Sequence, residues 1–259
     1  MQSNPGKRIL ITGASKGIGK ALSLEYAKRS CEILLLARSV DEIEKISAQI
    51  NNSGASAYFK ECDVTKHEEV KAAVDFAVEK MGGVDIAILN AGVSRRQNPD
   101  SSFLNDYRFI FETNVFGILN GLNCLLPLMK EQGQGIIAGV SSLSDFRGLN
   151  GYGAYNSSKI AVSTILESLR LEHKNSGIRI ITIRPGFVRT PMTANNKFYM
   201  PFLMDAEVAA KIIINGIERG KKRISFPLTL TFASYLAKTL PGAIYEGIIG
   251  TFGKKYLGD

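Results

Sequence analysis

The chain has 259 residues, enough for one large domain or two small ones, and 45% of them are hydrophobic while 22% are charged. With 25 glycines and 8 prolines, this composition excludes collagen-like, disordered and low-complexity proteins. The surplus of 32 lysines and arginines over 24 acidic residues gives a net charge of +8, but the basic residues form only short clusters. We therefore expect no nucleic-acid partner.

The N-terminal residues and the cysteines bear on the compartment. Met1–Arg8 is polar and basic, and the apolar run that follows is too short for a signal peptide or a membrane span. Cys31, Cys62 and Cys124 are odd in number and widely spaced, so they predict reduced thiols rather than a disulfide framework or a metal site. We expect a cytoplasmic protein without a targeting segment and without a metal.

Short runs rich in Ile, Leu and Val alternate with segments of helical periodicity. The predicted strands are Ile9–Thr12, Ile33–Ala37, Ala57–Phe59, Asp85–Leu89, Ile136–Val140 and Ile178–Ile183. The predicted helices are Ile18–Arg29, Val40–Asn51, Glu68–Met81, Asn105–Lys130 and Ala154–His173. Strands that are apolar on both faces and separated by helices are typical of a covered parallel sheet. The sequence therefore predicts the α/β class, as a Rossmann-like doubly wound parallel sheet with helices on both faces. No repeat or linker interrupts it, so we expect one domain over residues 1–259.

The pattern loosens after the sixth strand. Phe187–Met204 is predicted to be a long loop, within which residues 193–205 are expected to contact the substrate. Its apolar side chains predict an apolar mouth of the site and are Phe198, Tyr199, Met200, Phe202 and Leu203. Ala206–Gly220 resumes helical spacing, and Arg223–Phe226 is predicted to be one more strand.

The C-terminal segment, residues 227–259, is apolar and aromatic but too often interrupted to span a bilayer. Two helices flanking Pro241-Gly242 fit this pattern. The segment has three possible uses: packing against the domain, packing against another subunit, or weak peripheral membrane contact. In the last case, Lys238, Lys254 and Lys255 would lie near lipid head groups.

A glycine-rich turn follows the first strand. Gly13, Gly17 and Gly19 allow a tight turn at a helix N-terminus, where free backbone N–H groups and the helix dipole attract a phosphate. The spacing does not fit a P-loop, and Ala21 rather than Ser or Thr follows Lys20. The second strand ends at Arg38 with no acidic residue, and the turn carries a second cation, Lys16. An arginine there accommodates the 2′-phosphate of NADP, so the sequence favours NADP(H) over NAD(H).

Tyr155 and Lys159 are four residues apart at the start of a predicted helix, so both side chains project from one face. Ser142 lies at the end of the strand Ile136–Val140, on the same edge of the sheet. Together with the glycine turn, Asn90-Ala91-Gly92, Asn114 and Arg184-Pro185-Gly186, these residues resemble the short-chain dehydrogenase/reductase (SDR) family, in its NADP(H)-preferring form of roughly 250 residues. The resemblance covers about the first three quarters of the chain.

The resemblance implies a set of cofactor-binding residues along the carboxyl edge of the sheet. They are Gly13, Ser15, Lys16, Gly17, Ile18, Gly19, Arg38, Asp63, Val64, Asn90, Ala91, Gly92, Tyr155, Lys159, Pro185, Gly186, Val188 and Thr190. It also implies a homodimer or homotetramer, built through the helices Asn105–Lys130 and Ala154–His173.

The implied activity is an NADPH-dependent oxidoreductase that transfers hydride to a ketone or aldehyde, or catalyses the reverse alcohol oxidation. Tyr155 is the expected general acid and base, with its pKa lowered by Lys159, and Ser142 is expected to hold the substrate oxygen. The resemblance adds a ribose contact for Lys159 and a water-linked proton relay for Asn114. The alternative is a catalytically silent NADP(H)-binding sensor or partner-binding protein, which loss of Ser142, Tyr155 or Lys159 would have favoured.

Overall fold

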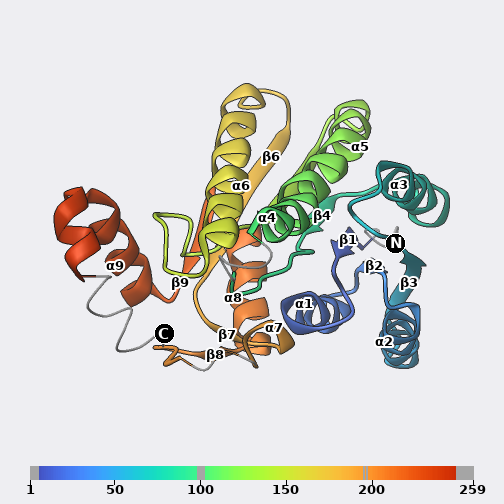
Figure 1. Cartoon of the computed structure of the whole chain (residues 1–259). Coiled ribbons are helices and arrows are strands. Elements are labelled where there is room, and N and C mark those ends of the chain that lie inside the picture. Colours follow the sequence, from blue (N-terminus) through green and yellow to red (C-terminus); the bar gives the residue numbers. More distant parts are fainter. Residues whose placement is uncertain (1–5, 98–102, 195, 197, 249–259) are drawn as a thin grey trace.

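The computed structural model describes residues 6–97, 103–194, 196 and 198–248. Seven parallel strands form a central sheet, which confirms the predicted parallel sheet, and their order is β3-β2-β1-β4-β5-β6-β9 (Figure 1). The strands are β1 (Arg8–Thr12), β2 (Glu32–Ala37), β3 (Ser56–Glu61), β4 (Ile86–Leu89), β5 (Gly135–Val140), β6 (Ile178–Pro185) and β9 (Arg223–Phe226). Strand order reverses between β1 and β4, where the crossovers diverge to opposite faces and leave a crevice at the carboxyl ends.

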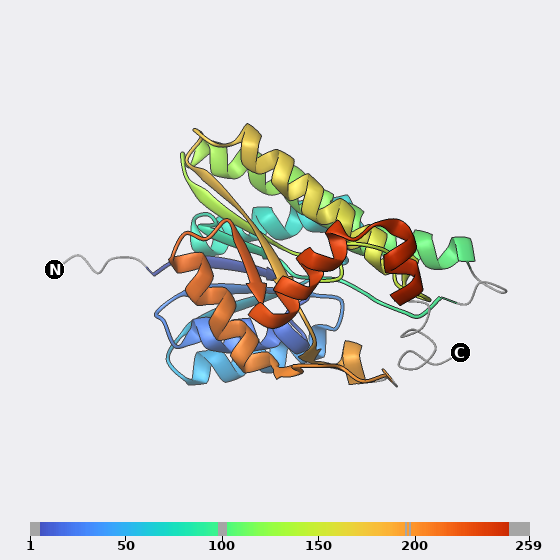
Figure 2. The ribbon, with the colours of Figure 1, turned by 90° about the vertical axis from the view of Figure 1, so that its left-hand side faces the viewer.

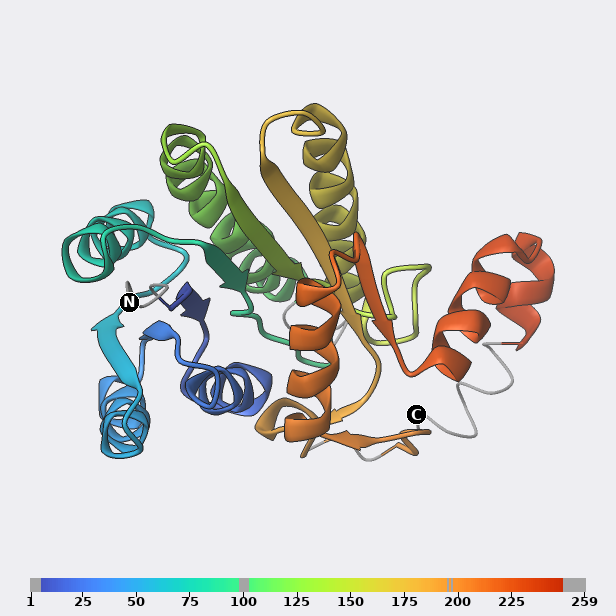
Figure 3. The ribbon, with the colours of Figure 1, turned by 180° about the vertical axis from the view of Figure 1, so that it is seen from behind.

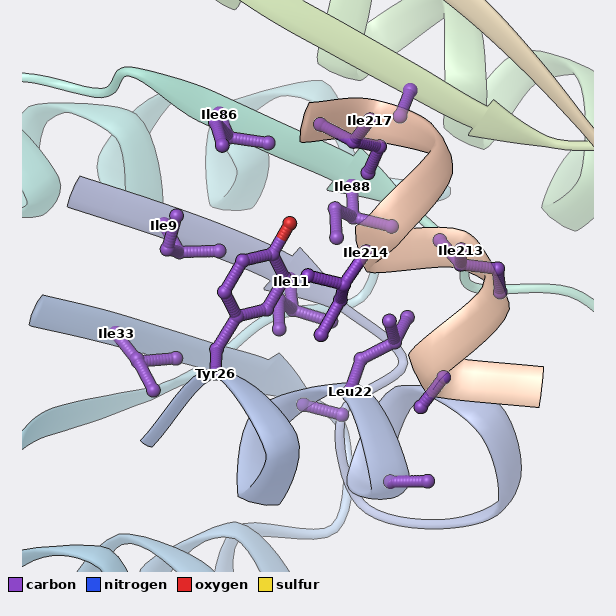
Figure 4. Close-up of a cluster of buried hydrophobic side chains, with 14 of the residues drawn as sticks. Ile9, Ile11, Leu22, Tyr26, Ile33, Ile86, Ile88, Ile213, Ile214 and Ile217 are labelled. Carbon is purple, nitrogen blue, oxygen red and sulfur yellow. The ribbon is translucent and has the colours of Figure 1, made fainter. Parts of the chain in front are cut away.

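Helices cover both faces of the sheet, which is why its central strands are apolar on both sides (Figure 2). The helices of one layer are α1 (Gly17–Ala27), α2 (Val40–Asn52) and α8 (Ala206–Glu218). Those of the other are α3 (His67–Met81), α5 (Gly117–Glu131) and α6 (Gly153–Glu172). Figure 4 shows the first core, where Leu22 and Tyr26 of α1 meet Ile213, Ile214 and Ile217 of α8.

The prediction of one helix over Asn105–Lys130 is wrong in one respect, because this stretch is not a single α-helix. It consists of α4 (Phe103–Phe111), a π-helical turn η1 (Glu112–Phe116) and α5. A π-helical turn adds one residue to the ring closed by each hydrogen bond, which hydrophobic periodicity does not reveal. The whole stretch Phe103–Glu131 is long and apolar enough to span a membrane, but half of its most apolar window is buried inside the fold, as in the core helix of a globular protein.

The long loop predicted after β6 contains short elements. They are β7 (Val188–Arg189), α7 (Pro191–Ala194) and β8 (Met204–Asp205), and the two strands pair with each other in parallel. Elements of two to four residues are too short to produce a periodic pattern. Within the expected substrate loop 193–205, Asn195 and Lys197 lie outside the described residues.

The C-terminal segment forms α9 (Leu228–Thr239) and a second helical stretch over residues 242–248, so a break at Pro241 is confirmed. Figures 1 and 3 show α9 standing away from the body of the fold. Leu228 and Phe232 are 80% and 72% exposed, so α9 buries little of its apolar surface. Ile249, Phe252, Lys254 and Lys255, which the sequence prediction included, lie outside the described residues.

Candidate active site

A cavity of about 270 Å³ opens at the carboxyl ends of the central strands. It is lined by eighteen of the twenty predicted site residues, which come from the ends of β1 to β6, from α1 and α6, and from the chain around β7. These are Gly13, Ser15, Lys16, Gly17, Ile18, Arg38, Asp63, Val64, Asn90, Ala91, Gly92, Ser142, Tyr155, Lys159, Pro185, Gly186, Val188 and Thr190. The two that do not line the cavity, Gly19 and Asn114, lie behind its wall.

The glycine turn is fixed by close packing and by hydrogen bonds from the end of β4. Gly13 and Gly17 have φ angles of +66° and +57°, which side chains rarely adopt. A Cβ on Gly19 would lie 2.2 Å from the carbonyl oxygen of Gly13, so Gly19 permits the turn to pack rather than touching a ligand. Asn90 Nδ2 donates to the carbonyl oxygens of Thr12 and Gly13 at 3.0 and 3.2 Å. Asn90 therefore supports the turn as well as lining the cavity.

The residues present fit a dinucleotide. Helix α1 begins at Gly17, so the N–H groups of its first turn have no intrahelical acceptors and lie at the cavity, with no side chain capping them. A Cβ on Gly13 would lie 2.9 Å from Ala91 Cα, and one on Gly92 would lie 3.4 Å from Lys159 Nζ. Because these positions carry no side chain, the main chain itself forms this part of the cavity wall, where its N–H groups can approach a phosphate.

The two cations that the sequence predicts to contact a 2′-phosphate both lie at the cavity. Lys16 and Arg38 are exposed and both line the cavity. Asp63 lies close enough to be influenced by Arg38: burial raises the pKa of this carboxyl, but hydrogen bonds from Thr65 and the charge of Arg38 together bring its pKa below the ordinary value. In the described part of the chain, no ion pair holds the Arg38 guanidinium within 4 Å.

Tyr155 and Lys159 occupy the first two turns of α6, at the end of β5. Lys159 Nζ donates to the carbonyl oxygen of Val140 at 2.9 Å and lies 5.7 Å from the centre of the Tyr155 ring. Only 3% of Lys159 is exposed. The lysine is therefore anchored to the strand while its charge lies beside the phenol.

Burial dominates the proton affinity of both groups. It raises the pKa of Tyr155, an effect that interaction with Ser142 opposes and the charge of Asp145 reinforces. Burial also lowers the pKa of Lys159 to about 8. The net lowering of the Tyr155 pKa that the sequence predicts is wrong for this structure, because the effect of burial outweighs the effects that would lower this pKa. Tyr155 is consequently a neutral phenol near neutral pH, in the state that can donate a proton.

The two serines after β5 have different surroundings. Ser142 Oγ lies 2.8 Å from Ser144 Oγ and accepts from the Ser144 backbone N–H at 3.2 Å. Ser141 is 2% exposed, and its Oγ donates to the carbonyl oxygen of Lys159 at 2.9 Å. Ser141 therefore links strand to helix, while Ser142 presents the hydroxyl nearer to Tyr155.

Asn114 lies in the π-helical turn, completely buried. Its Oδ1 accepts from Val93 N at 2.8 Å, and its Nδ2 lies 3.0 Å from both Val93 O and Ser158 Oγ. The amide thus holds the chain that follows β4 against α6. A Cβ on Gly92 would lie 3.2 Å from Asn114 Oδ1, which places Asn114 behind the same wall as Lys159.

Ten cavity-lining residues were not among the predicted site residues, although Thr193 falls within the expected substrate loop 193–205: Ala37, Ser39, Cys62, Val93, Thr113, Val140, Ser141, Pro191, Met192 and Thr193. Most of them are next to a motif residue in the sequence, and this adjacency is the signal by which they could have been predicted. The last three follow Thr190 in α7, whose place over the cavity depends on how the chain folds back after β6. The structure also pairs Asp145 with Arg184 just behind the site, a contact that sequence spacing did not suggest.

The sequence matches a known protein family. The model of the short chain dehydrogenase family matches residues 7–198, about three quarters of the chain, which includes the glycine turn, Ser142, Tyr155 and Lys159. The protein belongs to this family. The family expectation drawn from the motifs is therefore confirmed, whereas the family match leaves the choice between NAD and NADP to other observations.

Individual relatives of this short-chain dehydrogenase agree with that assignment. An uncharacterized oxidoreductase of Myxococcus xanthus is 37% identical over 237 residues, covering 92% of this chain and 94% of its own. A short-chain dehydrogenase/reductase of Burkholderia phymatum, in complex with NAD, is similar in fold with a TM-score of 0.83, 22% identity and coverage of 92% and 94%. An alcohol dehydrogenase of Thermococcus sibiricus, complexed with 5-hydroxy-NADP, gives a TM-score of 0.73 at 27% identity, with coverage of 85% and 94%. Both solved structures share the fold of this chain, and each contains the nucleotide that is named for it.

Proposed function

We propose that this protein is an NADPH-dependent carbonyl reductase, able also to catalyse the reverse oxidation of an alcohol. The observation that carries the proposal is that Ser142, Tyr155 and Lys159 line the same cavity as the glycine turn and Arg38. A ligand held at the turn by its phosphates would extend toward the Tyr155 hydroxyl. A silent binding protein has no need of this acid/base arrangement.

When bound, the nicotinamide cofactor supplies or accepts the hydride. Tyr155 donates a proton to the carbonyl oxygen in reduction and removes it from the alcohol in oxidation. Ser142 donates a hydrogen bond to the same oxygen and holds it in place. Lys159 stabilises the tyrosinate left after donation, because its charge lies 5.7 Å from the ring. The raised pKa of Tyr155 keeps this phenol protonated near neutral pH but also makes it a weaker acid, so the nearby charge of Lys159 matters when the proton leaves.

The preference for NADPH rests on Arg38 and Lys16. Arg38 follows directly on β2, where an acidic residue would be needed to bind a ribose 2′-hydroxyl. Its planar guanidinium can donate two parallel hydrogen bonds to a 2′-phosphate, and Lys16 adds a second positive charge at the cavity. The position of Asp63 does not offset this preference, since its carboxylate is already held by Thr65.

The substrate proposed here is a small to lipophilic ketone or aldehyde. Met192 and Thr193 line the cavity. Phe198 lies near both Tyr152 and Phe187, with ring centres 6.1 and 5.9 Å away. Because Tyr152 is three residues before Tyr155, this aromatic cluster lies near the start of α6 and supports a preference for apolar substrates.

Paired titrations with NADPH and NADH at fixed salt test the proposal. We expect NADPH to bind the wild type at least tenfold more tightly, and we expect Arg38→Ala to remove most of this preference. Glu32→Ala, a change at the opposite end of β2, is the matched control and should leave the preference intact. Equal affinities in the wild type would contradict the NADPH assignment.

A panel of aliphatic and aromatic carbonyls then tests turnover. We expect NADPH oxidation with the wild type, a rise in kcat/KM with substrate hydrophobicity, and a loss of at least a thousandfold in kcat for Tyr155→Phe. Binding of NADPH without turnover of any carbonyl or alcohol would instead favour the silent sensor.

A further inference from the structure

A buried ion pair lies directly behind the proposed active site. Asp145 is three residues after Ser142, in the connection from β5 to α6, and Arg184 immediately precedes Pro185 in β6. Their side chains are 3% and 8% exposed. Arg184 Nε donates to both carboxylate oxygens of Asp145, at 3.0 and 2.8 Å, and a terminal nitrogen of Arg184 also pairs with Oδ1. Desolvation largely offsets the attraction within a buried pair, so stability alone does not account for it.

The Asp145 carboxylate is also joined to the helix that carries the acid/base residues. Ser163 Oγ of α6 donates to Asp145 Oδ2 and lies 2.8 Å from Ser141 Oγ. Ser141 Oγ in turn donates to the carbonyl oxygen of Lys159. Since Ser163 lies one turn beyond Lys159, these contacts fix α6 against the end of β5 at the level of the active site.

Backbone hydrogen bonds complete the turn that carries Ser142. Asp145 N donates to Ser142 O at 3.2 Å, and Leu143 N donates to Pro185 O at 2.9 Å. The turn is therefore attached to β6 twice, once through the backbone at Pro185 and once through the ion pair at Arg184. The placement of the Ser142 hydroxyl depends on both attachments.

Arg184 has one further partner, which belongs to the protruding C-terminal helix. Its Nη1 donates to Tyr235 Oη at 3.1 Å, and the guanidinium carbon lies 5.2 Å from the centre of the Tyr235 ring. Tyr235 is on α9, where Ser234 is the sole buried side chain of the helix as the structure describes it. An exposed helix is thus connected directly to a buried charge that lies behind the active site.

We propose that Asp145 and Arg184 are positioning residues, which hold Ser142 in place beside Tyr155 and couple that placement to α9 through Tyr235. The proposal rests on the catalytic roles given above for Ser142 and Tyr155. Burial has the largest effect on both groups: it raises the pKa of Tyr155 and lowers the pKa of Lys159. The charge of Asp145 raises the pKa of both, which shows that its carboxylate lies close to them. Whatever covers or moves α9 would therefore alter the active site.

The sharpest test is Tyr235→Phe, which removes only the hydroxyl that accepts from Arg184. Tyr245→Phe is the control, because Tyr245 is also in the C-terminal segment but donates to Gly148 O and, among the described residues, makes no hydrogen bond with Arg184. We measure hydrogen exchange of the Leu143 and Asp145 amides, kcat with a carbonyl substrate, and NADPH affinity. We expect about tenfold faster exchange and about tenfold lower kcat in Tyr235→Phe, the effect of one hydrogen bond to a charged group, with NADPH affinity unchanged.

Asp145→Asn should have the same effects more strongly, and Tyr235→Phe serves alone if Asp145→Asn fails to fold. Unchanged exchange in Tyr235→Phe, or faster exchange without a fall in kcat, would overturn the proposal. Equal effects in Tyr245→Phe would overturn the route through Arg184. If the wild type turned over no carbonyl or alcohol, the proposed function would fail, while the exchange comparison would still decide whether the ion pair holds the turn.

Discussion

Tyr155 and Lys159 begin the same helix four residues apart, yet loss of hydration affects the proton affinity of each more than their mutual attraction does. The pKa of Tyr155 is raised, and that of Lys159 is lowered to about 8. Both shifts disfavour charge in the cavity wall. Spacing along a helix identifies such a pair, but their charge state depends on the strand end that buries them, here at Val140.

A stability measurement tests this for Lys159. Its pKa is about 8 in the folded protein and about 10.4 in an unfolded chain, so between these values the unfolded state binds more protons and stability rises with pH. Below about pH 8 the native state therefore carries a buried charge that costs at most about 3 kcal/mol. Lys159→Met removes that cost but also a hydrogen bond to Val140 O, worth about 1 kcal/mol.

We therefore expect Lys159→Met to unfold in urea with a free energy about 1–2 kcal/mol higher than the wild type near pH 7, and to be catalytically inactive. The difference should shrink as the pH rises toward about 9.5, because the wild-type lysine loses its proton. Lys20→Met, a change of an exposed lysine on α1, is the control and should show no such pH dependence. A destabilised Lys159→Met would contradict the inference that burial dominates.

At the scale of elements, the π-helical turn η1 is the clearest departure from the sequence prediction. It interrupts a helix whose periodicity is otherwise regular, and it brings Asn114 to Val93 and Ser158. Asn114 itself was identified from the sequence, through the resemblance of its motif to the family. The extra residue in the turn was not, because it is stabilised by contacts with the chain after β4, 21 residues away.

Asn114→Ala should be costly for this reason. The substitution leaves the N–H and C=O of Val93 without the amide that pairs with both, and each buried polar group left unpaired costs about 1–3 kcal/mol. We expect a loss of about 2–4 kcal/mol in the free energy of unfolding, measured in urea. Asn120→Ala, on the same helical stretch, loses one hydrogen bond to Val64 O and should cost only about 1 kcal/mol. Equal losses in the two variants would argue against a special role for the π-helical turn.

At the scale of the whole molecule, two apolar faces are exposed. The helix layer of α4, η1 and α6 exposes Phe109, Phe116 and Ile160, and α9 exposes Leu228 and Phe232. Exposed apolar side chains gathered in this way are typical of contact surfaces. We propose that the first face joins subunits into a homodimer or homotetramer.

Light scattering after gel filtration tests this assembly. We expect a mass that is twice or four times 28.2 kDa for the wild type, and dissociation to 28.2 kDa for Phe116→Asp, because a charge at an apolar interface loses its hydration. Phe232→Asp on α9 is the control. Dissociation by Phe232→Asp alone would instead make α9 the subunit interface, and a wild-type mass of 28.2 kDa would reject association.

The sequence by itself determined the class of fold, the position of almost every strand, the family, and eighteen residues of the cavity wall. The fold class and the strands were predictable because hydrophobic period is a local property and parallel strands bring their carboxyl ends to one edge. The family and most of the eighteen cavity residues followed from the resemblance of the motifs to that family. Only the tertiary structure decided the π-helical turn, the charge states of Tyr155 and Lys159, and the pairing of Asp145 with Arg184 across 39 residues. Those features depend on burial and on contacts between distant segments, which arise only when the layers pack.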